Sequence, residues 1–134
     1  MGRQPGPAHP AAFATLMLPF GAAGGYVGVA MGYVLAKAGV PVAEIAALIG
    51  VDYIPSALKF LWAPVVDTTL SRKGWYGIGG CGVALGIGAL GLIPHPEHAM
   101  PLVYLTVLAI SISKTLIGMT TGGLMAYDLS LIHI

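Results

Sequence analysis

Positions 11–36 contain no Asp, Glu, Lys or Arg, and this uncharged run constrains the chain more than any other feature. About 20 apolar residues are enough for an α-helix to cross the ~30 Å hydrocarbon core of a bilayer, and the run is longer than that. Inside a bilayer every backbone N–H and C=O needs a partner within the protein, so only helices and closed barrels span it. The run therefore predicts a membrane helix.

A secretory signal peptide is the alternative interpretation of this segment. Its apolar region is typically about 7–15 residues long and precedes a small-x-small cleavage site. Here the uncharged run is longer, and no such site stands out from the surrounding Gly and Ala residues. We expect a retained helix.

The overall composition leads to the same class of protein. Only 8% of the residues are charged, against about 25% in soluble domains, and the mean hydropathy is +0.86. We therefore expect the lipid bilayer as a partner. The net charge of +1 provides no basic face for phosphates, so no nucleic acid is expected. The single cysteine gives no disulfide framework, and we expect neither a metal nor a cofactor.

Three further spans are predicted at about 43–66, 75–93 and 102–127. Gly39 and Pro41 end the first span, because both residues break helices. Pro55 and Pro64 interrupt the second, where packing against neighbouring helices tolerates them. Polar stretches at 67–74 and 94–101 separate the others. The expected fold class is all-α: one domain over 1–128, forming a polytopic bundle of four transmembrane helices.

The basic residues near the ends of the spans predict the orientation. Cytoplasmic loops of membrane proteins are enriched in Lys and Arg. One side of the predicted bundle carries Arg3, Arg72 and Lys73, and the other carries Lys37 with Glu44 and Glu97. We therefore expect a multi-pass protein of the inner (plasma) membrane with a cytoplasmic N-terminus.

Lys114 is the most informative single residue, because it lies near the middle of the last span. A charge at the bilayer centre costs roughly 2.5–3.5 kcal/mol even on insertion scales, and such residues usually face a water-filled cavity or a counter-charge. Lys114 is thus a candidate for a solute or ion pathway. A structural ion pair, or a shifted register that lets the side chain reach the interface, is the alternative.

Asp52 and Lys59 are charged residues in the interior of the second predicted span. Their separation of seven positions equals two helical turns, which would place them on one face about 10 Å apart. Lys59 is long enough to extend to the interface, whereas Asp52 needs a partner or a wet cavity. Asp52 could carry a proton or form a fixed pair, so both residues join Lys114 as pathway candidates.

Gly24, Gly28 and Gly32 form a stripe on one face of the first span. Small residues at this spacing let helix backbones approach closely in lipid. Packing among several helices explains the stripe better than a dedicated dimer does. The later spans repeat the pattern at Gly82/Gly86 and at Gly118/Gly122.

No group of residues predicts catalysis, and an enzyme is not expected. Two matches to GxGxxG within 77–91 lie inside one apolar span. Dinucleotide binding requires that motif between a strand and a helix. No nucleophile, base and orienting residue can be grouped either.

Several short segments resemble a known family. LPFG at 18–21, KAGV at 37–40 and SALKFLWAPVVD at 56–67, followed by RKGW at 72–75, are similar to the first helices of AmpG-like muropeptide permeases and the related acetyl-CoA transporters of the major facilitator superfamily. The similarity covers most of residues 12–76 and is only general beyond them.

This resemblance implies a protein of about twelve helices in two halves that rock about a central site, with the C-terminal half missing here. Asp67, Arg72 and Lys73 match the cytoplasmic gating loop, where the carboxylate would meet a helix N-terminus or an Arg of the other half. Ala63, Thr68 and Ser71 depart from the loop motif. Helices one and four line the cavity in this superfamily, which favours Lys114 facing the solute.

The six residues at 129–134 match the translation of a sequencing-library adapter, CTG TCT CTT ATA CAC ATC. We therefore expect a non-native tail and a reading frame that was cut soon after Asp128, which would make the fragment inactive by itself.

The expected function is secondary transport, proton-coupled, of a small polar or anionic solute such as a muropeptide-like compound. The alternatives are a drug or metabolite exporter of the same superfamily and a small four-helix structural or regulatory membrane protein. A reading frame that continues past Asp128 would distinguish the transporters from the small protein.

Overall fold

The computed structural model describes residues 9–132, and every regular element in that range is helical. The all-α prediction is confirmed. Arg3 and positions 133–134 lie outside the described residues. The elements are α1 (Pro10–Gly25), the π-helix η1 (Tyr26–Met31), α2 (Gly32–Lys37), α3 (Val42–Ala57), α4 (Lys59–Thr68), α5 (Arg72–Gly91), the 3₁₀-helix η2 (Pro96–His98) and α6 (Met100–Ile132).

The first three elements form one continuous helix, Pro10–Lys37, over the long uncharged run. It ends at Gly39, whose φ of 85° is readily available only to glycine. The Val40 N–H donates to the Leu35 carbonyl at 3.0 Å and the Gly39 N–H to the Ala36 carbonyl at 3.1 Å. This pair of bonds satisfies the last carbonyls of the helix and turns the chain toward α3.

The second predicted span is broken rather than straight. Pro55 has no N–H to donate within α3, and its ring crowds the preceding turn. The helix ends at Ala57, and α4 leaves it at an angle of 45°. Most residues of α4 are exposed, and among its hydrophobic side chains only Val66 is buried.

The predicted loop at 67–74 is shorter in the structure, because helices enter it from both sides. The Ser71 hydroxyl accepts a hydrogen bond from the Gly74 N–H at 3.2 Å and caps α5. Arg72 and Lys73, which we expected in a loop, are thus the first residues of α5. Asp67 lies in the last turn of α4.

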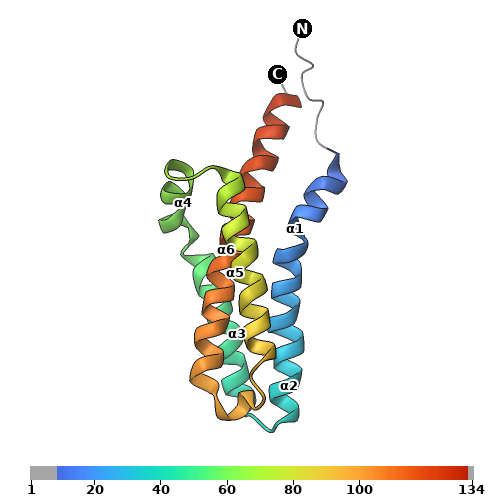
Figure 1. Ribbon diagram of the computed structural model, residues 1–134, viewed down its shortest axis with the longest axis vertical. Helices are drawn as coiled ribbons and strands as arrows, with labels where there is room; N and C mark the ends of the chain where they lie inside the picture. The colour runs from blue at the N-terminus through green and yellow to red at the C-terminus, as the bar shows by residue number, and fades with distance from the viewer. Residues whose placement is uncertain (1–8, 133–134) are drawn as a thin grey trace.

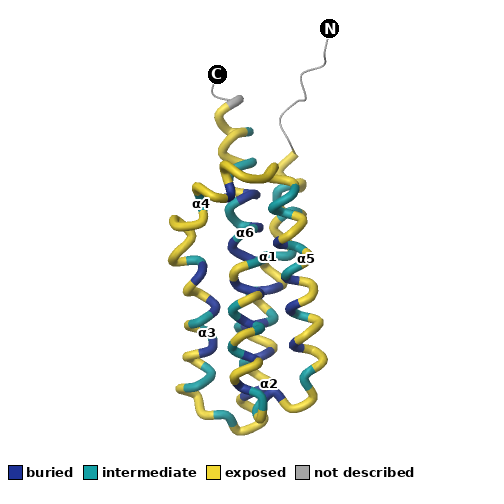
Figure 2. The backbone as a smooth tube through the Cα atoms, turned by 60° about the vertical axis from the view of Figure 1, so that its left-hand side comes forward, coloured by how far each residue is buried: buried dark blue, intermediate teal, exposed yellow. Residues whose placement is uncertain are grey.

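Helices that follow one another across a turn, α1–α2 and α3, α3–α4 and α5, and α5 and α6, run in opposite directions, and α6 packs against α5, α3 and α1 (Figure 1). The start of α1, the turn between α4 and α5 and the end of α6 lie at one end of the bundle, and the α2–α3 turn and η2 lie at the other. Buried residues face α6 and exposed residues face outward (Figure 2). The core contains Ala23, Val27, Met31, Leu35, Leu48, Val83, Leu90, Met100, Val103, Val107, Ile110 and Ile117.

Glycines bring α5 and α6 into close contact. A Cβ added to Gly79 would lie only 2.8 Å from the Ser113 carbonyl oxygen. Gly82 and Gly86 face α6 in the same way, against Ser113 and Ile110 respectively. A larger residue at these positions would push the helices apart, so the Gly82/Gly86 pattern does mark a helix contact.

The stripe on the first helix has a different environment. A Cβ at Gly24 or Gly28 would meet nothing within 4 Å among the described residues, and one at Gly32 would meet only Ile45, at 3.8 Å. The described residues therefore do not use Gly24 and Gly28 for close packing. Gly24 lies in the last turn of α1, and Gly28 lies within the π-helix η1.

Two helices, Pro10–Lys37 and Met100–Ser130, are long and apolar enough to cross a membrane, and the bent pair Val42–Ala57 and Lys59–Thr68 would be a third if it forms one span. The third predicted span, at about 75–93, corresponds to α5, which does not belong to this group. Eight of its 20 residues are glycine, which contributes little hydrophobicity. Membrane association therefore rests on two or three helices.

Candidate functional site

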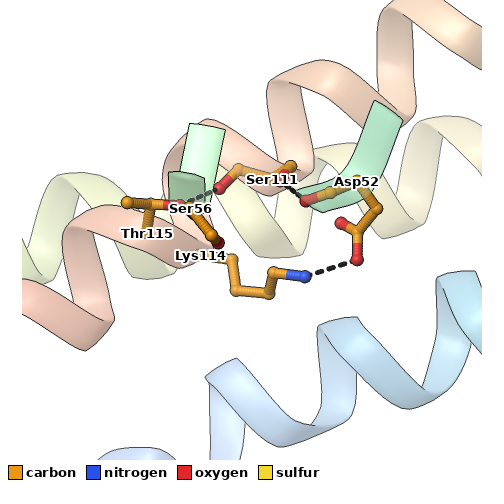
Figure 3. Close-up of polar contacts among 5 residues, drawn as sticks. All are labelled: Asp52, Ser56, Ser111, Lys114 and Thr115. Carbon is orange, nitrogen blue, oxygen red and sulfur yellow. Dashed lines mark hydrogen bonds and ion pairs between the residues drawn. The ribbon is translucent and has the colours of Figure 1, made fainter. Parts of the chain in front are cut away.

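The Lys114 ammonium forms an ion pair with Asp52 in the centre of the bundle (Figure 3). Lys114 Nζ, from α6, lies 2.6 Å from Asp52 Oδ2, from α3, and the two side chains are only 5% and 6% exposed. A buried charge is tolerated when it is paired in this way. Asp52 is thus the counter-charge of Lys114, and Lys114 is the partner that Asp52 was expected to need.

Two aromatic rings complete the surroundings of the Lys114 ammonium. Its Nζ lies 5.7 Å from the ring centroid of Phe20, on α1, and 5.9 Å from that of Tyr53, on α3. At these distances the ring faces attract a cation. Three helices therefore meet at this one ammonium group.

Asp52 uses only part of its hydrogen-bonding capacity. Oδ2 accepts from Lys114, and the main-chain carbonyl of Asp52 accepts from the Ser111 hydroxyl. Oδ1 is buried and has no hydrogen-bond partner among the described residues. An unpartnered carboxylate oxygen inside a protein is costly.

Hydroxyl groups continue the polar region toward the α4 end of the bundle. The Thr115 hydroxyl donates to the Ser111 carbonyl at 2.8 Å. Its oxygen is therefore free to accept from the Ser56 hydroxyl, 3.3 Å away (Figure 3). Sequence analysis missed these hydroxyls. The spacing of Ser111, Lys114 and Thr115 at i, i+3 and i+4 places them on one helix face and could have revealed the group.

Two adjoining cavities open beside the hydroxyl pair. The inner one, of about 290 Å³, is lined by Met17, Phe20, Ser56, Lys59, Thr115, Gly118 and Met119. The outer one, of about 440 Å³, is lined by Lys59, Phe60, Ala63, Val66, Asp67, Arg72, Gly118, Met119, Thr120, Gly122 and Gly123. Because they share Lys59, Gly118 and Met119, we treat them as one space, the α6 cleft.

The α6 cleft separates the predicted pathway residues into two groups. Lys59 is exposed and lines both cavities, whereas Asp52 and Lys114 line neither. The helix break at Leu58 interrupts the shared face that we expected for Asp52 and Lys59. Of the two lysines, Lys59 rather than Lys114 therefore faces the open space.

The three gating residues are also divided. Asp67 and Arg72 line the outer cavity, and Lys73, although exposed, does not. The Arg72 guanidinium lies against the backbone of Gly123, where an added Cβ would be 2.7 Å from Nη1. Within the described range, none of these three residues takes part in an ion pair.

The other charged cluster lies in the loop at the opposite end of the bundle. His95 Nδ1 is 3.3 Å from Glu97 Oε1, and the rings of His95 and His98 are 6.0 Å apart. Residues 9–132 contain no group of three or more His, Cys, Asp or Glu side chains that could hold a metal ion. The interaction seen in this loop is the local contact between His95 and Glu97.

Comparisons with protein-family models, with curated proteins and with solved structures found no match. The transporter resemblance therefore stays a prediction.

Proposed function

We propose that this chain is part of a proton-coupled secondary transporter of the major facilitator type, similar to AmpG-like permeases. It would carry a small polar or anionic solute, such as a muropeptide-like compound, across a bacterial-type inner membrane. The observation that carries this proposal is the ion pair between Asp52 and Lys114, held near the middle of a helix long enough to cross the membrane. Charged residues at that depth are typical of solute and ion pathways.

The proposal includes four membrane crossings, with α5 as the third in chain order. Support comes from its position alongside α6 and from the glycine contacts between the two helices. After Lys73, no charged residue occurs in α5. The basic residues Arg72 and Lys73 would lie on the cytoplasmic side, and with them the start of the chain.

Asp52 would provide the proton coupling. A proton on Oδ1 would neutralise the carboxylate and weaken its hold on Lys114. The ammonium could then turn toward an anionic group in the adjacent cleft, whose lining residue Phe20 already lies 5.7 Å from Nζ. Proton and anion would thus bind together, as symport requires, because each binding event lowers the cost of the other.

A transporter of the proposed family has two halves. In the proposed family the two halves rock about a central site. Asp67, Arg72 and Lys73 would then gate the cytoplasmic side by contacts with the other half. These contacts would explain why the three residues have no ion-pair partner among the described residues.

Uptake of a labelled anionic sugar-peptide into vesicles tests the proposal. The protein would be the full reading frame continuing past Asp128, energised by an imposed proton gradient. We expect Lys114→Ala to lower the initial rate at least about tenfold, which corresponds to the loss of one charge-assisted contact, and Lys73→Ala to keep gradient-driven uptake with weaker gating. Equal uptake by wild type and Lys114→Ala would remove Lys114 from the pathway. A natural stop codon directly after Asp128 would favour a small four-helix membrane protein instead.

A further inference from the structure

We infer that the α6 cleft is an oxyanion-binding site in which Lys59 and Arg72 hold the phosphate or carboxylate group of a water-soluble solute. This deepens the proposed function by naming the class of solute and a place where it binds at the Arg72 end of the bundle, and it rests on that function. The site differs from the Asp52–Lys114 pair, because neither of those residues lines the cleft.

The charged residues that line the cleft favour the binding of an anion. Lys59 and Arg72 line the outer cavity together with one carboxylate, Asp67. Within the described range, none of the three has an ion-pair partner. The cleft therefore presents two cations to one anion, and an added anion would be attracted to it.

The position of Arg72 strengthens this preference. It is the first residue of α5, where the helix dipole and the free N–H groups already create positive potential. A cation at that position is unfavourable for the helix itself. An anion bound beside it would relieve the repulsion, and the N–H groups and dipole of a helix N-terminus themselves favour phosphate or carboxylate groups.

The α6 wall of the cleft leaves room for the ligand. Three of its residues, Gly118, Gly122 and Gly123, have no side chain, and a Cβ on Gly122 would meet nothing within 4 Å in the part of the chain that the structure describes. The guanidinium of Arg72 rests on Gly123. The cleft joins two cavities of about 290 and 440 Å³. Their combined volume is within the range of roughly 300–1,000 Å³ that is usual for small-molecule sites.

The inner end of the cleft adds specificity for a polar solute. Ser56 and Thr115 line it, and their hydroxyls can exchange hydrogen bonds with a bound molecule. Lys59 lies between this end and Arg72, because it lines both cavities. A solute would thus bind with its anionic group at Lys59 and Arg72 and its hydroxyl or amide groups toward Ser56.

Nuclear magnetic resonance of the ¹⁵N-glycine-labelled chain in neutral phosphatidylcholine nanodiscs tests this site. The probe is inorganic phosphate, with sodium chloride at equal ionic strength as the reference. We expect saturable shifts of the Gly122 and Gly123 amides. Lys59→Gln and Arg72→Gln should each weaken the apparent affinity at least about tenfold, since each substitution removes a charge-assisted hydrogen bond to the phosphate.

Lys73→Gln is the matched control, because it removes the same charge from the next residue without lining the cleft. It should leave the affinity within about twofold of wild type, and Lys59→Arg should retain most of the binding. Equal weakening by all three glutamine variants would overturn the site in favour of general attraction. Shifts that occur only in nanodiscs containing phosphatidylglycerol would overturn the solute in favour of a lipid headgroup.

The phosphate-binding experiment and the transport experiment can fail independently of each other. Phosphate binding in the cleft, together with a full-length protein that takes up no solute, would contradict the proposed function and support the anion site. Lys114-dependent uptake without phosphate binding would overturn the anion site and support the transporter.

Discussion

Lys114 Nζ lies 2.6 Å from Asp52 Oδ2, although the two residues are 62 positions apart in the chain. The contact joins α6 to α3, and both side chains are at least nine-tenths buried. Breaking a buried pair by removing one partner is far more costly than replacing both, because the remaining charge is left without compensation. This asymmetry gives the pair a measurable signature.

Asp52→Asn should destabilise the folded chain by about 3–5 kcal/mol, because the Lys114 ammonium would stay buried without a counter-charge. Thermal unfolding in a mild detergent, followed by circular dichroism, measures the change. The double variant Asp52→Leu with Lys114→Met should recover most of the lost stability. A double variant that is as unstable as the single one would mean that the pair does not act as a unit.

The glycine contacts between α5 and α6 predict a difference between adjacent positions. Gly79→Ala should destabilise by about 1–3 kcal/mol, since its Cβ would lie 2.8 Å from the Ser113 carbonyl oxygen and overpacking costs this much. Gly80→Ala is the control, because a Cβ there meets nothing within 4 Å. We expect it to be neutral or slightly stabilising. Equal midpoints of unfolding for the two variants would argue against close packing at Gly79.

The loop at Pro96–His98 should depend on pH. A backbone hydrogen bond to Glu97, assisted by His95 and His98, favours the carboxylate and holds the pKa of Glu97 below its ordinary value of 4.5. A lowered pKa in the folded state means that this contribution is present above about pH 4.5 and is lost as the pH falls through the folded pKa. Carboxyl ¹³C titration should therefore give a lower midpoint in the folded chain than in a peptide covering residues 92–100. Identical midpoints would contradict the loop geometry.

The helices were predictable because their signals are local. Uncharged runs and the breaking residues Gly39 and Pro41 lie next to each other in sequence, so the first helix was placed to within about one residue. The bend at Leu58 was less predictable. Pro55 indicated an interruption, but its angle depends on how α3 and α4 pack against α6.

The site depended on contacts that are distant in sequence. Spacing along one helix suggested that Asp52 and Lys59 share a face, whereas the ion pair joins Asp52 to Lys114 on another helix. The glycine stripes have the same limitation. Gly24 and Gly82 fit the same pattern, and only the packing of the helices determines that, within residues 9–132, Gly82 is in close contact while Gly24 is not.

The number of membrane crossings tests the central claim most directly, because a buried charge pair on a pathway requires helices that pass from one side to the other. Cys81, the only native cysteine, would be replaced by Ala, and single cysteines introduced as Leu70→Cys, between α4 and α5, or His95→Cys, between α5 and α6. Both positions are exposed. The label is a membrane-impermeant maleimide, applied to right-side-out and inverted vesicles.

With four crossings, Leu70→Cys reacts only from the cytoplasmic side and His95→Cys only from the opposite side. Labelling of both positions from the same side would show that α5 does not cross, and it would contradict the account.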